Sequence, residues 1–138
     1  MFPQDIHILI VDDMKGVRIL ISKLLGELGY KKISEAGNGQ EAFDALENQR
    51  KSGNAVGLVI ADFRMPVMDG LQFLAKVRNS SEYASLPFIM LSAESEKDNV
   101  IQALKAGVTD YLIKPATVKT LQKKLENAWG IVHGTKTA

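Results

Sequence analysis

Short apolar runs alternate along the chain with longer segments in which apolar residues recur every three or four positions. Short apolar runs bounded by polar residues are typical of buried strands, and the longer spacing is typical of helices that pack on one face. The clearest strand-like runs are residues 8–11, 57–61, 88–91 and 111–113, with a weaker one near 32–35. The alternation predicts a parallel α/β sheet built from five strand–helix units.

The clearest predicted helix begins near Val17 and ends before Gly29, because glycine is favoured just past a helix C-terminus. The other helices are expected at about 40–50, 70–77, 96–106 and 118–132, the last two with Ser95 and Thr117 as N-caps. Residues 48–54 are polar and rich in turn formers, so we expect a long, solvated connection there. Residues 133–138 are expected to be a frayed tail.

The 138 residues, 46% hydrophobic and 24% charged, are typical of one soluble globular domain, with a core over about 6–132. A net charge of +1 argues against a nucleic-acid surface, and the absence of cysteine excludes disulfides, thiolate metal sites and cysteine nucleophiles. The sequence contains no apolar stretch of the roughly 18 residues that span a bilayer and no signal-peptide pattern. We therefore expect a monomeric, cytoplasmic protein that binds neither nucleic acid nor membrane.

Polar residues follow four of the predicted strands. They are Asp12 and Asp13 after the first strand, Asp62 after the third, Ser92 after the fourth and Lys114 after the fifth. In parallel α/β sheets, functional residues gather at the carboxyl ends of the strands, where the strand order reverses. The pattern predicts a single site.

Three neighbouring carboxylates repel one another unless a cation lies between them, and Mg²⁺ is a hard ion that prefers such oxygens. The chemistry consistent with the whole set is attack by the Asp62 carboxylate on phosphorus. Mg²⁺ and Lys114 would neutralise the transferred charge, and the Ser92 hydroxyl would donate to a phosphoryl oxygen. Taken singly, Asp12 or Asp13 could instead be an N-cap, and Ser92 and Lys114 could be ordinary surface residues.

Four motifs, in this order and spacing, resemble the receiver domains of two-component response regulators, most closely the CheY-like single-domain regulators of chemotaxis. The motifs are residues 10–13 (IVDD), 61–70 (ADFRMPVMDG), 91–94 (LSAE) and 111–115 (YLIKP). The resemblance runs from about Ile6 to Trp129. It implies a flavodoxin-like, doubly wound sheet of five parallel strands in the order 2-1-3-4-5, which is the order of CheY itself, with five helices.

The resemblance also implies roles for individual residues. Asp62 would be the phosphoacceptor, supplied by a histidine kinase. The Mg²⁺ ligands would be Asp12, Asp13, Asp62 and the carbonyl oxygen of Arg64. The protein would be a signalling phosphoacceptor that assists its own phosphorylation and dephosphorylation, rather than a classical enzyme.

Ser92 and Tyr111 would form a switch that changes the face presented to a flagellar motor switch protein or another effector. In this switch Ser92 moves toward the phosphoryl group and Tyr111 turns from exposed to buried. From its position in the strand alone, Tyr111 could equally be a half-buried strand aromatic. The Lys114–Pro115 bond is expected to be cis, as the resemblance implies.

Two positions depart from the CheY-type pattern. Arg64 stands where asparagine is usual, and Ala116 stands where phenylalanine is usual. We expect Arg64 to project over the mouth of the site and to pair with Glu94 on the opposite rim. Such a gate would restrict the approach of water to the acyl phosphate.

Three other functions compete with this prediction. A single-domain phosphorelay intermediate would pass its phosphoryl group to a histidine phosphotransfer domain, and the sequence does not choose between relay and effector. A haloacid dehalogenase-type phosphatase needs Asp-x-Asp after its first strand, and the segment after Asp12 lacks a second acid at that spacing. An FMN carrier needs a hydroxyl- and glycine-rich phosphate loop, whereas Asp12 and Asp13 would repel the phosphate.

Overall fold

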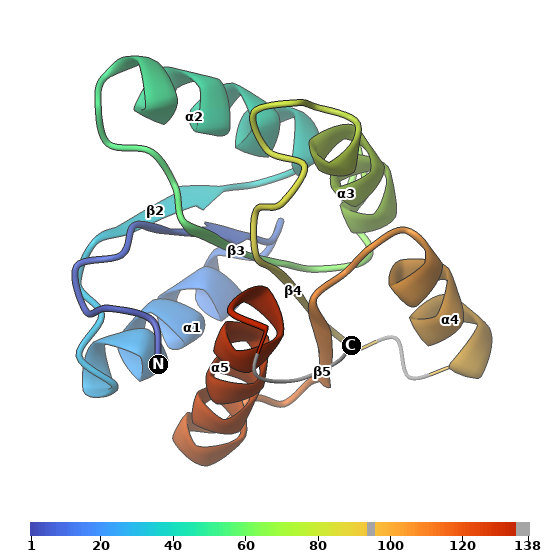
Figure 1. Ribbon diagram of the computed structural model, residues 1–138. Coiled ribbons are helices and arrows are strands. Elements are labelled where there is room, and N and C mark those ends of the chain that lie inside the picture. The colour runs from blue at the N-terminus through green and yellow to red at the C-terminus, as the bar shows by residue number, and fades with distance from the viewer. Residues whose placement is uncertain (94–95, 135–138) are drawn as a thin grey trace.

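The computed structural model describes residues 1–93 and 96–134. Within these residues it contains one parallel sheet of five strands in the order β2-β1-β3-β4-β5, which confirms the predicted topology (Figure 1). The strands are β1 (Ile8–Val11), β2 (Ile33–Ala36), β3 (Leu58–Ala61), β4 (Phe88–Ser92) and β5 (Asp110–Ile113). Strand β1 lies at the centre of the reversal, since Ile8 is opposite both Ile33 of β2 and Leu58 of β3.

Helices cover both faces of the sheet (Figure 1). Among the described residues they are α1 (Lys15–Glu27), α2 (Gly39–Lys51), α3 (Gly70–Arg78), α4 (Lys97–Lys105) and α5 (Val118–Val132). Alternate strand side chains enter two different clusters. Leu9 and Val11 pack with residues of α2, α3 and α4, whereas Ile8 and Ile10 pack with residues of α1 and α5. Burial on both faces explains why β1, β3 and β4 are nearly continuous apolar runs rather than alternating ones.

The helix ends follow the predicted signals. Thr117 caps α5 by accepting from the backbone N–H of Thr120. Gly29 and Gly107 have φ angles of 97° and 95° just beyond α1 and α4, and only glycine adopts such angles without strain. Ser95, the expected N-cap of α4, lies outside the described residues. Helix α5 ends at Val132, and 135–138 of the expected frayed tail also lie outside them.

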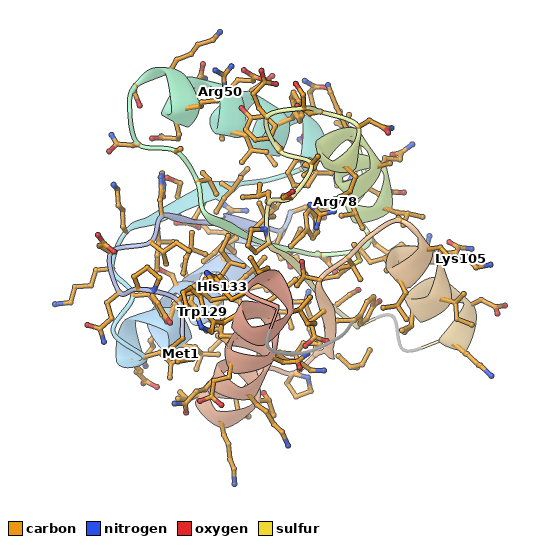
Figure 2. All side chains as sticks on the ribbon, viewed as in Figure 1. Met1, Arg50, Arg78, Lys105, Trp129 and His133 are labelled. Carbon is orange, nitrogen blue, oxygen red and sulfur yellow. The ribbon has the colours of Figure 1, made fainter. Side chains whose placement is uncertain are left out.

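The helix expected over about 40–50 is confirmed. Because α2 continues through Lys51, the solvated connection expected over 48–54 is wrong for residues 48–51. Arg50, on the last turn of α2 (Figure 2), pairs with Glu47 at 2.7 Å and donates from Nε to the Tyr83 hydroxyl at 3.1 Å. Cations near a helix C-terminus are also favoured by the helix dipole. The turn follows the helix, at Gly53 with a φ of 83°.

The loop between β3 and α3 brings the chain back behind the end of β3. The backbone N–H of Gly70 donates to the Phe63 carbonyl at 2.9 Å, and a Cβ at Gly70 would overlap the carbonyl oxygen of Asp62. Val67 has a φ of 68° and lies between Pro66 and Met68, which are joined by an N–H to carbonyl bond of 2.7 Å. This is a γ-turn, and it exposes 82% of Val67 at the tip of the loop.

The Lys114–Pro115 bond after β5 is cis, as expected.

In the described part of the chain, every helix is too short or too polar to cross a membrane.

Candidate functional site: an acidic cluster at the carboxyl edge of the sheet

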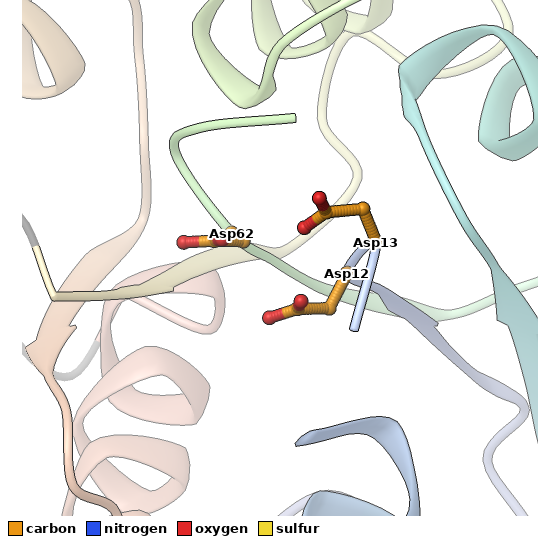
Figure 3. A group of neighbouring side chains, drawn as sticks. All are labelled: Asp12, Asp13 and Asp62. Carbon is orange, nitrogen blue, oxygen red and sulfur yellow. The ribbon is translucent and has the colours of Figure 1, made fainter. Parts of the chain in front are cut away.

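Three carboxylates meet where β1 and β3 end. Asp12, Asp13 and Asp62 each offer an oxygen, and these oxygens lie within 4.8 Å of one another (Figure 3). Asp12 is 3% exposed, Asp62 is half-buried and Asp13 is exposed. Three carboxylate oxygens at this spacing, one of them open to solvent, suit a hard divalent cation that keeps some of its water.

Asp12 is held on both carboxylate oxygens. Its Oδ1 accepts from the backbone N–H of Met14 at 2.9 Å, and its Oδ2 accepts from Nζ of Lys114 at 2.9 Å. The N-cap position of α1 is occupied by Met14, which makes no side-chain cap bond. The N-cap interpretation of Asp12 and Asp13 is therefore wrong, since neither stands at the cap position.

Asp62 has donors on its two oxygens. The backbone N–H of Phe63 donates to Oδ1 at 2.8 Å, and Nζ of Lys114 lies 3.6 Å from Oδ2. Burial raises the pKa of Asp62, and the nearby charge of Asp12 raises it further. The charge of Lys114 and the hydrogen bonds from Ser92 and the Phe63 N–H lower this pKa and so partly offset the burial. The charge on this carboxylate is thus disfavoured mainly by burial and also by the nearby charge of Asp12, and a bound cation would offset both.

Ser92 and Lys114 come from the two strands next to β3. Ser92 is the last residue of β4 and is buried, and the backbone N–H of Lys114 donates to its carbonyl at 2.8 Å. This bond fixes the ends of β4 and β5 against each other, so hydroxyl and amine reach the acidic cluster together. Nζ of Lys114 pairs with two of the carboxylates, at 2.9 Å from Oδ2 of Asp12 and 3.6 Å from Oδ2 of Asp62.

Tyr111 lies on β5 and packs in the cluster shared with α2, α3 and α4. Only 8% of it is exposed, so it already occupies a buried position. Arg64 is exposed at the rim, with its guanidinium carbon 5.1 Å from the centre of the Phe63 ring. Glu94, the other half of the expected gate, lies outside the described residues.

Sequence reasoning missed Arg18. Its side chain runs from α1 to the edge that carries the acidic cluster, where it contacts the Asp12 carbonyl and Glu35. The signal that could have found it is a basic residue on the inner part of an otherwise apolar helix face, between Val17 and Ile21. The bonds themselves depend on backbone geometry that the sequence does not display.

Residues 8–126 match the family model of the response regulator receiver domain, so the chain belongs to that family. Its members are phosphoacceptor regulators of two-component signalling rather than classical enzymes, and the strand order and strand-end residues described above agree with this assignment.

Known relatives extend over almost the whole chain. A Campylobacter jejuni protein named as a chemotaxis protein CheY homolog is 40% identical over 131 residues, which cover 95% of this chain and 98% of the relative. Chemotaxis protein CheY1 of Helicobacter pylori is 40% identical over 123 residues, covering 89% and 96%. The chain is therefore similar to CheY-type proteins, as its motifs predicted.

Solved structures agree with the fold. The Vibrio cholerae chemotaxis protein CheY4 has a TM-score of 0.77 and 32% identity, and the match covers 90% of this chain and 98% of that one. A response regulator from Chloroflexus aurantiacus has a TM-score of 0.79 and 30% identity, covering 90% and 97%.

Proposed function

We propose that this protein is a chemotaxis response regulator in which Asp62 accepts a phosphoryl group from a histidine kinase. The observation that carries the proposal is the position of the Asp62 carboxylate. Its oxygens lie near those of two further carboxylates, Asp12 and Asp13, and it is also contacted by Lys114 at 3.6 Å and by a hydrogen bond from Ser92. The carboxylates can hold a cation, and Lys114 and Ser92 can hold phosphoryl oxygens. The chemotaxis assignment rests on the relatives, which are named as chemotaxis proteins.

Magnesium would be held by Asp12, Asp13, Asp62 and the carbonyl oxygen of Arg64. When bound, it neutralises charge on the phosphoryl oxygens during transfer. The carboxylates supply the hard oxygen ligands that this ion prefers, and the exposed position of Asp13 leaves room for water ligands.

The transfer itself uses the side chains of the chain. An oxygen of ionised Asp62 attacks phosphorus, and a P–O bond forms as the P–N bond to the donor histidine breaks. The electron pair of that bond stays on the imidazole nitrogen. No base is required, because the nucleophile is already ionised.

Lys114 and Ser92 then bind the product. Lys114, now on Asp12 and Asp62, would move onto a phosphoryl oxygen, and the Ser92 hydroxyl would donate to another. Ser92 would draw its loop inward, and Tyr111 would be held buried. The changed face of α4, β5 and α5 would then bind a flagellar motor switch protein or another effector.

The central test is labelling of Asp62→Asn with acetyl phosphate or a phosphorylated kinase in Mg²⁺. We expect labelling to be abolished, because an amide is not a nucleophile toward phosphorus. Asp69→Asn is the matched control, since Asp69 lies in the same loop and is the N-cap of α3. Asparagine is about as good an N-cap as aspartate, so this change should preserve the helix. Persistent labelling of Asp62→Asn would identify another nucleophile and refute the proposal.

The partner is tested by capture from the native cell on beryllofluoride-activated protein, with the Asp62→Asn variant as the inactive control. Enrichment of a motor component on the activated form alone supports an effector role. Enrichment of a histidine phosphotransfer domain, with transfer of label from Asp62 to it, would instead make the protein a phosphorelay intermediate.

A further inference from the structure

Arg18 crosses the edge of the sheet beside the acidic cluster. Its Nη1 donates to the backbone carbonyl of Asp12 at 2.6 Å, and its Nε donates to Oε1 of Glu35 at 2.9 Å. The side chain is 18% exposed, so most of it is packed in place. The guanidinium is a rigid planar fork, and its bond to Glu35 therefore also fixes the direction of the bond to Asp12.

The Asp12 carbonyl accepts its hydrogen bond from the Arg18 side chain because β2 ends before it can supply a backbone N–H. The N–H of Asp12 donates to the carbonyl of Ala36, the last residue of β2, and the chain then turns toward Asn38, the N-cap of α2. The parallel ladder thus stops where the Asp12 carbonyl would need its next N–H. A buried carbonyl requires a donor, and Arg18 supplies it.

This carbonyl belongs to the peptide group between Asp12 and Asp13. The group is planar and its plane contains the Cα atoms of both residues. Fixing its oxygen therefore helps to fix the orientation of both aspartates. With Oδ1 and Oδ2 of Asp12 also bonded, the turn that carries two of the three carboxylates is fixed at three points.

We propose that Arg18 is a positioning residue for the cation ligands, oriented by Glu35 and acting through the Asp12 carbonyl. The inference rests on the proposed function, since it assumes a cation among Asp12, Asp13 and Asp62. It deepens that function by assigning the geometry of the site to a residue that touches neither cation nor phosphoryl group.

Charge and geometry predict opposite results when Arg18 is changed to methionine. Loss of a nearby positive charge by itself strengthens binding of a cation. Loss of the fixed peptide weakens it, and partners of metal ligands typically contribute about 10–100-fold to affinity. We expect Arg18→Met to weaken Mg²⁺ binding by about tenfold, measured by calorimetric titration of the folded protein. Unchanged or tighter binding would overturn the inference.

Two further variants separate the causes. Arg18→Lys keeps the charge but lacks the planar fork, so its affinity should fall nearly as far as that of Arg18→Met. Full affinity in the lysine variant would assign the effect to charge and overturn the inference. Arg50→Met is the matched control, because it also removes one guanidinium and its bonds to Glu47 and Tyr83, at the far end of α2. It should bind Mg²⁺ as the unaltered protein does, and an equal loss in this control would count against Arg18.

A second readout follows labelling by acetyl phosphate as Mg²⁺ is varied. In Arg18→Met the half-saturating concentration should rise while the rate at saturation is kept, since the nucleophile is intact. A lower plateau with an unchanged midpoint would indicate general structural damage and overturn the inference. If Arg18→Met does not fold, Glu35→Gln replaces it, with a loss of about threefold expected and unchanged affinity overturning the inference.

Failure of the proposed function can be distinguished from failure of the role assigned to Arg18. If the unaltered protein neither binds Mg²⁺ nor is labelled at Asp62, the proposed function fails and the inference with it. If the unaltered protein does both and Arg18→Met binds Mg²⁺ equally well, only the role of Arg18 is lost.

Discussion

Asp12 and Asp13 are neighbours in the chain with different physical situations. Asp12 is buried and accepts from Met14 and Lys114, whereas Asp13 is exposed. A buried group that loses its partner costs about 1–3 kcal/mol, while an exposed carboxylate beside other carboxylates adds repulsion. Asp12 therefore contributes to the stability of the fold and to the site, whereas Asp13 contributes to the site.

The first prediction compares Asp13→Ala with Asp12→Ala. We expect Asp13→Ala to weaken Mg²⁺ binding while leaving the melting temperature without Mg²⁺ unchanged or slightly higher. Asp12→Ala should weaken binding and also lower the free energy of unfolding by about 1–3 kcal/mol, because Met14 and Lys114 lose an acceptor. Thermal melts with and without Mg²⁺ measure both effects. A large loss of stability in Asp13→Ala would show that its carboxylate has a structural role.

The second prediction concerns Arg64 at the rim of the site. Arg64→Asn should change the lifetime of the phosphoryl group on Asp62, because we propose that the side chain at this position controls the approach of water or contacts a phosphoryl oxygen. The melting temperature should barely move, since Arg64 is exposed and the ion pair expected with Glu94 would contribute only about 0–1 kcal/mol. Decay of the phosphoprotein at matched Mg²⁺ is the measurement, and identical decay rates would rule out a gate.

The residue scale also shows what the sequence could predict about the site. Asp12, Asp62, Ser92 and Lys114 could be placed together because parallel strands deliver their ends to one edge. Arg18 could not be placed at the site in this way, because it binds the backbone carbonyl of Asp12, which lacks a backbone donor where β2 ends.

At the scale of elements, the β3–α3 loop depends on the absence of a side chain at Gly70. The third prediction is that Gly70→Ala lowers the free energy of unfolding by about 3 kcal/mol or more, because its Cβ would overlap the Asp62 carbonyl oxygen. Gly16→Ala is the control, since a Cβ there meets no atom within 4 Å. That change should stabilise α1 by about 0.5–1 kcal/mol. Denaturant unfolding of both variants checks the contrast, and equal stability for the two would contradict it.

The elements were predictable in type and less so at their ends. Helical spacing located α1 and α5, together with Gly29 after α1 and the Thr117 N-cap before α5, because those signals are local. The last turn of α2 was predicted both as helix, over about 40–50, and as a connection, over 48–54, because residues 48–51 look like a loop in composition. That turn is held by a contact with Tyr83, which is 33 positions from Arg50 in the chain.

At the scale of the whole molecule, the N-terminal segment is tied to the body by a buried bond. The Tyr30 hydroxyl donates to the Phe2 carbonyl at 3.0 Å, and burial raises the pKa of Tyr30. In the unfolded chain tyrosine releases its proton near pH 10. Above that pH the unfolded state binds fewer protons than the folded state, so this group makes stability fall as pH rises.

The fourth prediction follows from that linkage. Tyr30→Phe should cost about 1 kcal/mol at neutral pH, through the lost hydrogen bond. Its free energy of unfolding should then fall less steeply than that of the unaltered protein as the pH rises above about 10, because the titrating hydroxyl is gone. Denaturant unfolding at several alkaline pH values measures the slopes. Parallel slopes would show that Tyr30 titrates alike in both states.

The sheet architecture was predictable from alternation, whereas the strand order came from the family resemblance. Apolar runs such as 58–61 indicate strands buried on both faces, which requires helices on both sides. Periodicity does not show which strands are neighbours, because β1, β3 and β4 are equally apolar and equally buried.

Trp129 is the single tryptophan of the chain, and it stands near the end of α5 with its ring 3.5 Å from that of His133 and 5.4 Å from that of Phe2 (Figure 2). Eleven residues separate it from the start of α5, which is about 16 Å of helix. The residue after Asp62 is Phe63, so no indole neighbours the acidic cluster in sequence. Intrinsic emission therefore reports on the far end of α5 and the N-terminal segment. A change in its intensity on activation would signal motion transmitted along that helix rather than local quenching by the ion or the phosphoryl group.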